Sequence, residues 1–223
     1  MIRIFIGYDK DEIAAYHVLA NSIIRQASEP VSIIPVAPHL VPLTRPHDAK
    51  QSNTFAFSRF LVPYLSKFDG WSIWMDADVI LRGDIADLWA LRDPDKAVQV
   101  VKKDFWPDDG TKFLGRPQSA YPELPDGTNR KLWSAMMLMN CSRCKELTPD
   151  YVNNASGLSL HQFKFLNDYD IGGLPAEWQH VVGVDEYNED AKLVHWSLGG
   201  PWFPGYENVE FASDWRAEWD YLK

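Results

Sequence analysis

Apolar runs of strand length alternate with a helical pattern in the first part of the chain. Residues 2–6 and 31–37 form two such runs, and apolar residues recur at helical spacing over 13–24 between them. A second helix is expected near 55–65, followed by the apolar run 71–81. This strand, helix, strand, helix, strand order predicts an α/β fold, with a mostly parallel central sheet covered by helices on both faces.

Further apolar runs follow in the second half of the chain, at 97–101, 132–139 and 192–196, and each predicts a strand. The segment 102–129 is rich in Pro, Asp and Gly. It is too long for a simple connection between two strands. We therefore expect it to be a lid or an acceptor-binding segment.

Two carboxylates, Asp76 and Asp78, interrupt the apolar run 71–81. Burying a carboxylate without a partner is costly, so both are expected at the end of the strand with a cation beside them. Side chains two residues apart in an extended segment project to the same side, and their oxygens suit magnesium or manganese. Since ligands bind at the carboxyl ends of parallel strands, residues 7–9 should converge on the same crevice.

His195 ends the last short apolar run. Taken alone, it is either a hydrogen-bonded structural histidine or a metal ligand. An imidazole beside two carboxylates would shift the preferred ion from magnesium toward manganese.

Composition limits the classes of partner. The 223 residues contain no repeat or linker, which indicates one domain, and the net charge of -9 argues against nucleic-acid binding. A phosphorylated small molecule remains compatible, because one divalent cation reverses the local field. The chain shows no secretory signal and no apolar run long enough to span a bilayer, so we expect a cytoplasmic protein without a transmembrane segment.

Cys141 and Cys144 form a single Cys-Ser-Arg-Cys motif. A redox pair or a zinc site is one interpretation, but zinc requires four ligands and no second pair is present. Two ordinary, partly buried thiols are the interpretation that the sequence favours.

The order of motifs resembles nucleotide-sugar glycosyltransferases of the GT-A fold, most closely glycosyltransferase family 8 and related bacterial and viral sugar transferases. The motifs lie at 57–63, at 74–85, and at His195 with 199–202. The resemblance implies a single Rossmann-like domain over 1–223. Residues 1–101 would form the nucleotide-sugar-binding half, and residues 102–223 the acceptor-binding and metal-completing half.

The resemblance also implies a site and a reaction. Asp76, Asp78 and His195 would hold Mn2+ or Mg2+. A hexose or deoxyhexose would pass from a nucleoside diphosphate, with UDP as the expected nucleotide, to a hydroxyl of a glycan or other acceptor, with retention of configuration. The implied donor site consists of Gly7, Tyr8, Asp9, Arg59, Asp76, Ala77, Asp78, Gly199 and Gly200.

The chain departs from this family at three places. The family usually has a lysine before the final Pro-Trp, whereas Gly200 precedes Pro201 here, so diphosphate neutralisation would rest on the metal or on a basic residue elsewhere. Trp133-Ser134-Ala135 replaces the usual Asn, small residue and Gly. Gln162 is only a weak substitute for the Asp-Gln-Asp that often holds the sugar.

Several candidates keep two interpretations. Lys102, Lys103 and Trp133 either contact the acceptor or form a solvated basic pair beside a core tryptophan. Gln162 and Glu177 are weak catalytic candidates, and Glu177 equally fits a turn cap; no catalytic base is assigned. The rival functions are a haloacid-dehalogenase-like phosphotransferase with Asp76 as nucleophile, and a non-catalytic sugar-binding module.

Overall fold

A six-stranded sheet forms the centre of the computed structural model, which describes all 223 residues. Strand β8 runs antiparallel to both of its neighbours, and the other neighbouring strands pair in parallel. The predicted α/β fold with a mostly parallel sheet is therefore confirmed. In spatial order the strands are β2 (Val31–Val36), β1 (Ile2–Gly7), β3 (Trp71–Met75), β8 (Met136–Asn140), β5 (Val98–Val100) and β9 (Ile171–Gly173).

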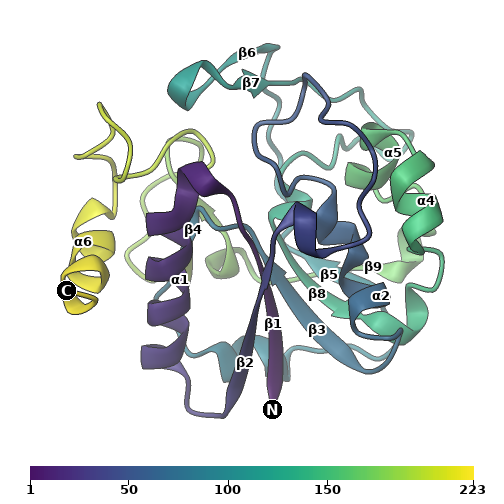
Figure 1. Cartoon of the computed structure of the whole chain (residues 1–223), viewed down its shortest axis with the longest axis horizontal. Coiled ribbons are helices and arrows are strands. Elements are labelled where there is room, and N and C mark those ends of the chain that lie inside the picture. The colour runs from purple at the N-terminus through teal and green to yellow at the C-terminus, as the bar shows by residue number, and fades with distance from the viewer.

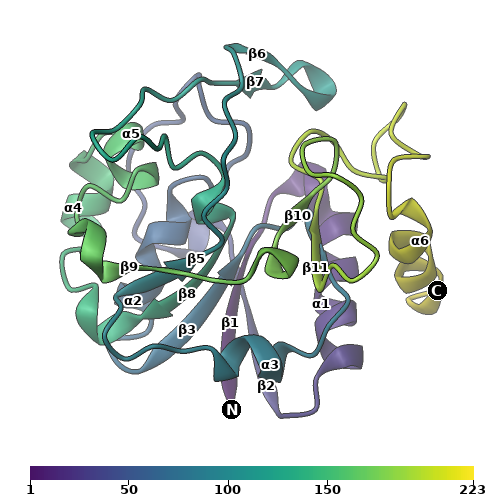
Figure 2. The same cartoon turned by 180° about the vertical axis from the view of Figure 1, so that it is seen from behind.

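Helices cover the sheet from two sides (Figure 1). One side carries α1 (Ile13–Gln26) and α6 (Ala212–Tyr221), and the other carries α2 (Val62–Leu65), α4 (Pro149–Asn154) and α5 (Gly157–His161). Helix α3 (Ile85–Ala90) lies near the lower end of the sheet in the reverse view (Figure 2). Short 3-10 turns lie at Lys10–Glu12, Pro38–Leu40, Ser58–Leu61, Phe113–Gly115, Trp133–Ala135, Cys141–Arg143, Asp168–Asp170 and Ala176–Trp178.

Two smaller sheets accompany the central one. Strands β10 (His180–Val181), β11 (Leu193–His195) and β4 (Val79–Leu81) form the first, in that order. Strands β6 (Gly110–Thr111) and β7 (Pro117–Gln118) form a hairpin within the long segment 102–129. This hairpin lies beyond the carboxyl ends of the central strands in both views (Figures 1 and 2).

The apolar run 71–81 forms two strands rather than the single strand expected from the sequence. Strand β3 belongs to the central sheet and β4 to the second sheet, so the chain changes sheets across Asp76–Asp78. The run is apolar on both faces because both of its parts are buried. The two aspartates therefore lie in the turn between two strands.

Two apolar clusters stabilise this arrangement. The larger contains 40 buried residues around the central sheet, and the smaller contains 8 buried residues, among them Val18, Ile80, Val194 and Trp215. The smaller cluster joins α1 and α6 to the second sheet. Both clusters reach the turn that carries the aspartates, because Ala77 and Val79 belong to the larger one and Ile80 to the smaller.

Most of the other predicted elements agree with the structure, with two further differences. The helix expected over 55–65 is a 3-10 turn followed by the single turn of α2. The strand expected over 132–139 begins only at Met136, since Leu132 has a left-handed backbone with φ 67° and a 3-10 turn follows it. The strand propensity of these residues does not reveal that the backbone turns at Leu132.

The cysteines, the tryptophans and the absence of a membrane-spanning helix can each be compared with the sequence expectations. Cys141 and Cys144 are free and buried, as expected for two ordinary thiols, and burial raises the pKa of both. Of the tryptophans, only Trp106 is exposed, so most of them serve the core. The structure contains no helix with the length and apolar character needed to cross a membrane.

Candidate active site

The turn between β3 and β4 places two carboxylates beside an imidazole. Asp76, Asp78 and His195 are all buried, and one ligand atom from each lies within 4.8 Å of the others. Strand β11 pairs antiparallel with β4, opposing His195 to Val79, which brings the histidine to the turn. The structure thus brings together the three residues that the sequence proposes as metal ligands.

Asp76 is held from two sides. Arg59 Nη1 lies 3.0 Å from Asp76 Oδ1, and the Trp74 indole N–H donates to the same oxygen at 2.8 Å. Arg59 also donates to the carbonyl oxygens of Ser134 and Ala56. Burial raises the pKa of Asp76 to about 6 despite the positive charge of Arg59, and the nearby Asp78 adds to the rise. A further positive charge would favour its ionised form.

Asp78 and His195 have atoms without hydrogen-bond partners. Their Oδ1 and Nε2 atoms lie 3.4 Å apart, and Asp78 Oδ1 and His195 Nδ1 are buried without a hydrogen bond. Burial works to raise the pKa of Asp78, but His195, Lys112 and Arg59 together bring it below its ordinary value. Two carboxylates and an imidazole with unpaired buried atoms form a donor set that fits a divalent cation such as Mn2+.

These three side chains line a pocket of about 300 Å³. Its walls come from the segment 48–59, the long segment 102–129, helix α5 and the residues after β11. No tryptophan lines it, so tryptophans do not form a sugar-stacking surface in this pocket. The charged and aromatic side chains that line it are Asp48, Lys50, Phe57, Arg59, Asp76, Asp78, Phe105, Lys112, Tyr121, Lys131, His161 and His195.

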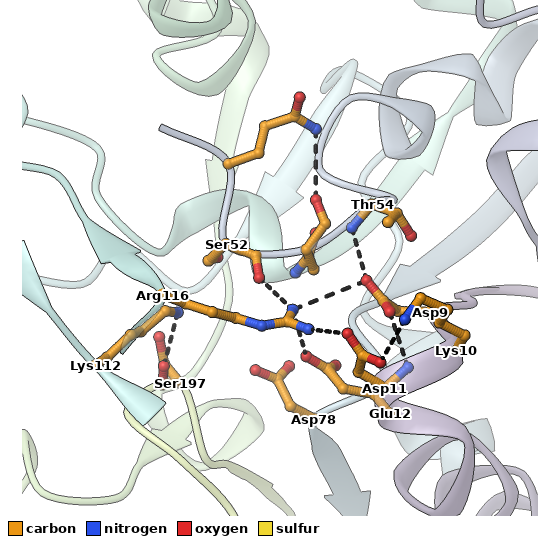
Figure 3. A network of polar contacts seen from close by, with 12 residues as sticks. Asp9, Lys10, Asp11, Glu12, Ser52, Thr54, Asp78, Lys112, Arg116 and Ser197 are labelled. Carbon is orange, nitrogen blue, oxygen red and sulfur yellow. Dashed lines mark hydrogen bonds and ion pairs between the residues drawn. The ribbon is translucent and has the colours of Figure 1, made fainter. Parts of the chain in front are cut away.

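The β6–β7 hairpin contributes two basic side chains to this region. Lys112 donates from Nζ to the carbonyl oxygen of Ser197 at 2.8 Å. Arg116 extends from the same hairpin to an acidic group after β1, with contacts of 2.6 Å to Asp11, 3.7 Å to Glu12 and 3.8 Å to Asp9 (Figure 3). No local sequence pattern identifies either residue.

Glu12 is a buried carboxyl at the edge of this network. Neither of its oxygens has a hydrogen-bond partner. Burial raises the pKa of Glu12 well above its usual value, and the negative charges of Asp78 and Asp9 add to this. Figure 3 shows its carboxyl group near Arg116 and Asp78.

His161 is a further pocket residue that sequence reasoning missed. Its Nδ1 lies 2.9 Å from the Ser134 hydroxyl, which itself accepts a contact of 3.3 Å from Arg59. Burial, followed by the charges of Arg59, Lys131 and Arg45, lowers the pKa of His161 well below its usual value. A neutral imidazole therefore lines the pocket. His161 directly precedes Gln162, which was the candidate named from the sequence.

The segment 7–9 lies beside the pocket without lining it. A Cβ on Gly7 would come within 2.5 Å of the Phe55 ring, so this glycine permits close packing. Tyr8 is half-buried against Tyr16. The buried Asp9 carboxylate accepts the backbone N–H groups of Asp11 and Thr54 at 3.0 and 2.8 Å.

The glycines after β11 are tightly packed by aromatic rings. A Cβ on Gly199 would come within 2.4 Å of Tyr206, and one on Gly200 within 2.1 Å of Trp202. Gly199 also has φ 131°, which L side chains rarely adopt. Neither glycine lines the pocket, and Ala77 is fully buried behind the two aspartates.

The weaker candidates lie outside the pocket. Lys102 is exposed, Lys103 pairs with Asp185, and the Trp133 indole donates to the Lys103 carbonyl oxygen at 2.9 Å. Gln162 is fully buried and donates to the carbonyl oxygens of Pro122 and Asn129, which ties the long segment to the body. Glu177 lies in the 3-10 turn Ala176–Trp178.

A curated relative shows the family of this chain. Protein CDI of Arabidopsis thaliana is 37% identical over 227 residues, which span 97% of this chain and 85% of the relative. The chain belongs to the Protein CDI family. No protein-family model matches it.

Solved structures show the fold of this CDI-family member. The bifunctional glycosyltransferase WbbM superposes with a TM-score of 0.64 at 17% identity, covering 98% of this chain, which spans about half (49%) of WbbM. The galactosyltransferase LgtC, solved with donor and acceptor sugar analogs, gives a TM-score of 0.59 at 11% identity and covers 99% of this chain and 96% of its own. The chain has the GT-A fold of nucleotide-sugar glycosyltransferases, as the motifs predicted.

Proposed function

We propose that this protein is a metal-dependent glycosyltransferase. It would move a hexose or deoxyhexose from a nucleoside diphosphate, with UDP as the nucleotide, to a hydroxyl of a glycan or small acceptor, with retention. The observation that carries the proposal is the buried Asp76–Asp78–His195 group lining a pocket of a GT-A fold. LgtC is a galactosyltransferase, and galactose is a hexose, which supports a hexose donor.

Some side chains of the site would bind the metal ion, and others position those ligands. A divalent cation held there would supply positive charge against the leaving diphosphate. Asp76, Asp78 and His195 would hold this cation, with manganese preferred because of the imidazole. Arg59 and Trp74 fix the Asp76 carboxylate through contacts of 3.0 and 2.8 Å to one oxygen, leaving the other oxygen available.

The lining of the pocket supports a proposed place for the nucleoside, the sugar and the acceptor. The nucleoside would lie toward the segment 7–9 at the carboxyl end of β1, as the family resemblance implies. The sugar would lie toward His161 and Tyr121, which line the same pocket as the metal group. The acceptor would then approach along the segment 102–129.

A nucleotide-sugar panel tests this proposal. Purified protein is incubated with UDP-glucose, UDP-galactose and other nucleotide sugars, with and without Mn2+, and UDP release and melting temperature are measured. At least one donor should bind and release UDP only when metal is present. The D78N variant, which removes one ligand charge, should abolish both effects.

Two outcomes would contradict the proposal. If no nucleotide sugar binds the protein with Mn2+ present, the transferase assignment is wrong. If transfer occurs but NMR shows an inverted anomeric centre in the product, only the assignment of retention is wrong.

The rival functions receive no support from a specific feature of the structure. The phosphotransferase hypothesis needs Asp76 as a nucleophile, but the fold is that of GT-A enzymes and Asp76 Oδ1 is engaged by Arg59 and Trp74. A sugar-binding module gives no reason to bury three metal-ligand side chains together.

A further inference from the structure

The β6–β7 hairpin is fastened to the body of the protein at two points. Arg116 contacts Asp9, Asp11 and Glu12 and donates to the Ser52 carbonyl oxygen (Figure 3). The second point is the buried Phe113 ring, which stacks on Phe203 with 4.6 Å between ring centroids and an interplanar angle of 17°. These two anchors fix the hairpin relative to the pocket.

Lys112 lies in the loop of the same hairpin, directly before Phe113. Its backbone N–H donates to the Arg116 carbonyl oxygen at 2.8 Å, and its carbonyl oxygen accepts from Gly115 N–H at 3.1 Å. Its ammonium donates to the Ser197 carbonyl oxygen, two residues after His195. An ammonium has three donors, and this contact uses one, so two remain for a ligand in the pocket that Lys112 lines.

The surroundings of Lys112 are those of an anion site next to a metal site. Burial lowers the pKa of its ammonium, whereas Asp78, Glu12 and Asp76 act in the opposite direction. A cation bound by Asp76, Asp78 and His195 would take up part of that negative charge. Lys112 would then face a second positive centre, and a polyanion between the two would satisfy both.

We infer that Lys112 binds the diphosphate of the donor and that Arg116 positions it by fastening the hairpin. This inference rests on the proposed function. This chain has no lysine beside Pro201 to neutralise the diphosphate. The inference assigns that role to a lysine more than eighty residues earlier in the sequence.

The other half-buried lysine of the pocket, Lys131, is less suited to this role. Lys131 donates to the Ser119 carbonyl oxygen at 2.8 Å, and its Nζ lies 4.1 Å from the centroid of the Tyr121 ring. Burial lowers the pKa of Lys131 to about 8, and the carboxylate that acts against this is Asp109 rather than a metal ligand. Its ammonium is therefore engaged by Ser119 and Tyr121 rather than by the metal-ligand carboxylates.

A binding experiment on the full chain tests the inference. Inorganic pyrophosphate and UDP, each with Mn2+, are titrated by calorimetry into wild type, K112Q and K112R. Loss of a charge-assisted hydrogen bond should weaken both ligands about 10- to 100-fold in K112Q. K112R keeps the charge and should recover part of the affinity.

A matched control is available in Lys96. Its Nζ donates to the Tyr169 carbonyl oxygen at 2.8 Å, the same distance as Lys112 to Ser197, but it lies outside the pocket. K96Q therefore removes one charge and one such hydrogen bond, and affinity for both ligands should stay within twofold of wild type. Uridine has no phosphate, so K112Q should leave any binding of uridine unchanged.

The outcomes separate this inference from the proposed function. If UDP binds wild type and K112Q equally, Lys112 does not contact the diphosphate, although the transferase assignment stands. If pyrophosphate binds in a Lys112-dependent manner but no nucleotide binds, Lys112 still contributes a diphosphate site, but the proposed function fails. If pyrophosphate with Mn2+ does not bind wild type, the inference is wrong.

A double-mutant cycle tests the positioning role of Arg116. If Arg116 acts by holding Lys112, then K112Q should cost much less affinity in the R116Q background than in wild type. Additive losses would mean that Arg116 acts independently of Lys112. Circular dichroism and melting of R116Q establish that the variant is folded before the cycle is measured.

Discussion

At the scale of single residues, the ion pair between Arg59 and Asp76 holds one of the three candidate metal ligands in place. Both side chains are buried, with 6% and 8% of their side-chain surface exposed. Arg59 reaches Asp76 and the Ser134 carbonyl oxygen through the same nitrogen, Nη1, so it joins the β3–β4 turn to the segment before β8. The pair thus favours the ionised form of Asp76 and also joins the segments packed around it.

Replacing Arg59 by methionine should destabilise the protein strongly. R59M keeps most of the side-chain volume but leaves a buried carboxylate without its partner, for which about 3–5 kcal/mol is typical. Urea denaturation followed by circular dichroism measures the loss in the free energy of unfolding.

A surface pair provides the control for this prediction. Arg143 lies 3.3 Å from Asp170, and 42% of its side chain is exposed, so R143M should cost about 0.2–1 kcal/mol. Equal losses in R59M and R143M would show that the buried pair contributes no more than a surface pair.

At the scale of elements, one arginine fastens the end of the long segment 102–129. Arg130, with φ 56°, contacts Asp126 at 2.7 Å within the segment and also pairs with Asp168 in the following 3-10 turn region. Burial works to raise the pKa of Asp126, but hydrogen bonds from Arg130 and Thr128 bring it to about 2. The segment is therefore held by a carboxylate that stays ionised well into acid.

This pair predicts an acid-dependent contribution to stability. The pKa of Asp126 falls from 3.8 to about 2 on folding, so its stabilisation is complete above pH 4 and is lost as the pH falls toward 2. Because 29% of the side chain is exposed, we expect about 1 kcal/mol rather than the full value of the shift. The difference in unfolding free energy between wild type and D126N, measured at pH 7, 4 and 2.5, checks this.

Asp108 supplies the control on the same segment. It is exposed and makes no ion pair in the structure, so D108N should match wild type at every pH. A D126N difference that persists unchanged at pH 2.5 would contradict the assigned ionisation.

Elements with a strong periodic pattern were predictable from the sequence, and elements made by long-range contacts were not. Helix α1 and strands β1 and β2 follow the apolar pattern closely. The division of 71–81 into β3 and β4 was not visible, because both strands are buried and read as one apolar run. The β6–β7 hairpin has only two residues in each strand, too few for a pattern.

The same distinction applies to the site. Asp76 and Asp78 were identifiable because carboxylates are unusual in an apolar run, and His195 because the order of motifs resembles a known family. Lys112 and Arg116 lie in a polar segment where charged residues are common. Their role depends on contacts with Ser197 and with the acidic residues after β1, which no local pattern encodes.

At the scale of the whole molecule, the metal group lies where two sheets meet. Asp76 and Asp78 occupy the turn from the central sheet into the second sheet, and His195 ends β11 of the second sheet. The larger apolar cluster also includes Val79, Leu81 and Leu193 of the second sheet, so the two sheets share part of one core. A cation held by all three side chains would therefore add a further connection between the two sheets.

Metal binding should consequently raise the melting temperature of the whole chain. Mn2+ at a hundredfold excess over its dissociation constant stabilises the folded state by about 2.7 kcal/mol. For a protein of this size that corresponds to a shift of about 5–10 °C, measured by calorimetry with and without Mn2+.

Replacing His195 distinguishes a metal site with three protein ligands from one made by Asp76 and Asp78 alone. H195A should abolish most of the Mn2+ shift, and since imidazole favours manganese, it should also remove the preference for Mn2+ over Mg2+. H39A removes an exposed histidine and should leave both quantities unchanged. If H195A retains the full shift and the full preference, His195 is a structural histidine, and the cation binds to the β3–β4 turn alone without joining the two sheets.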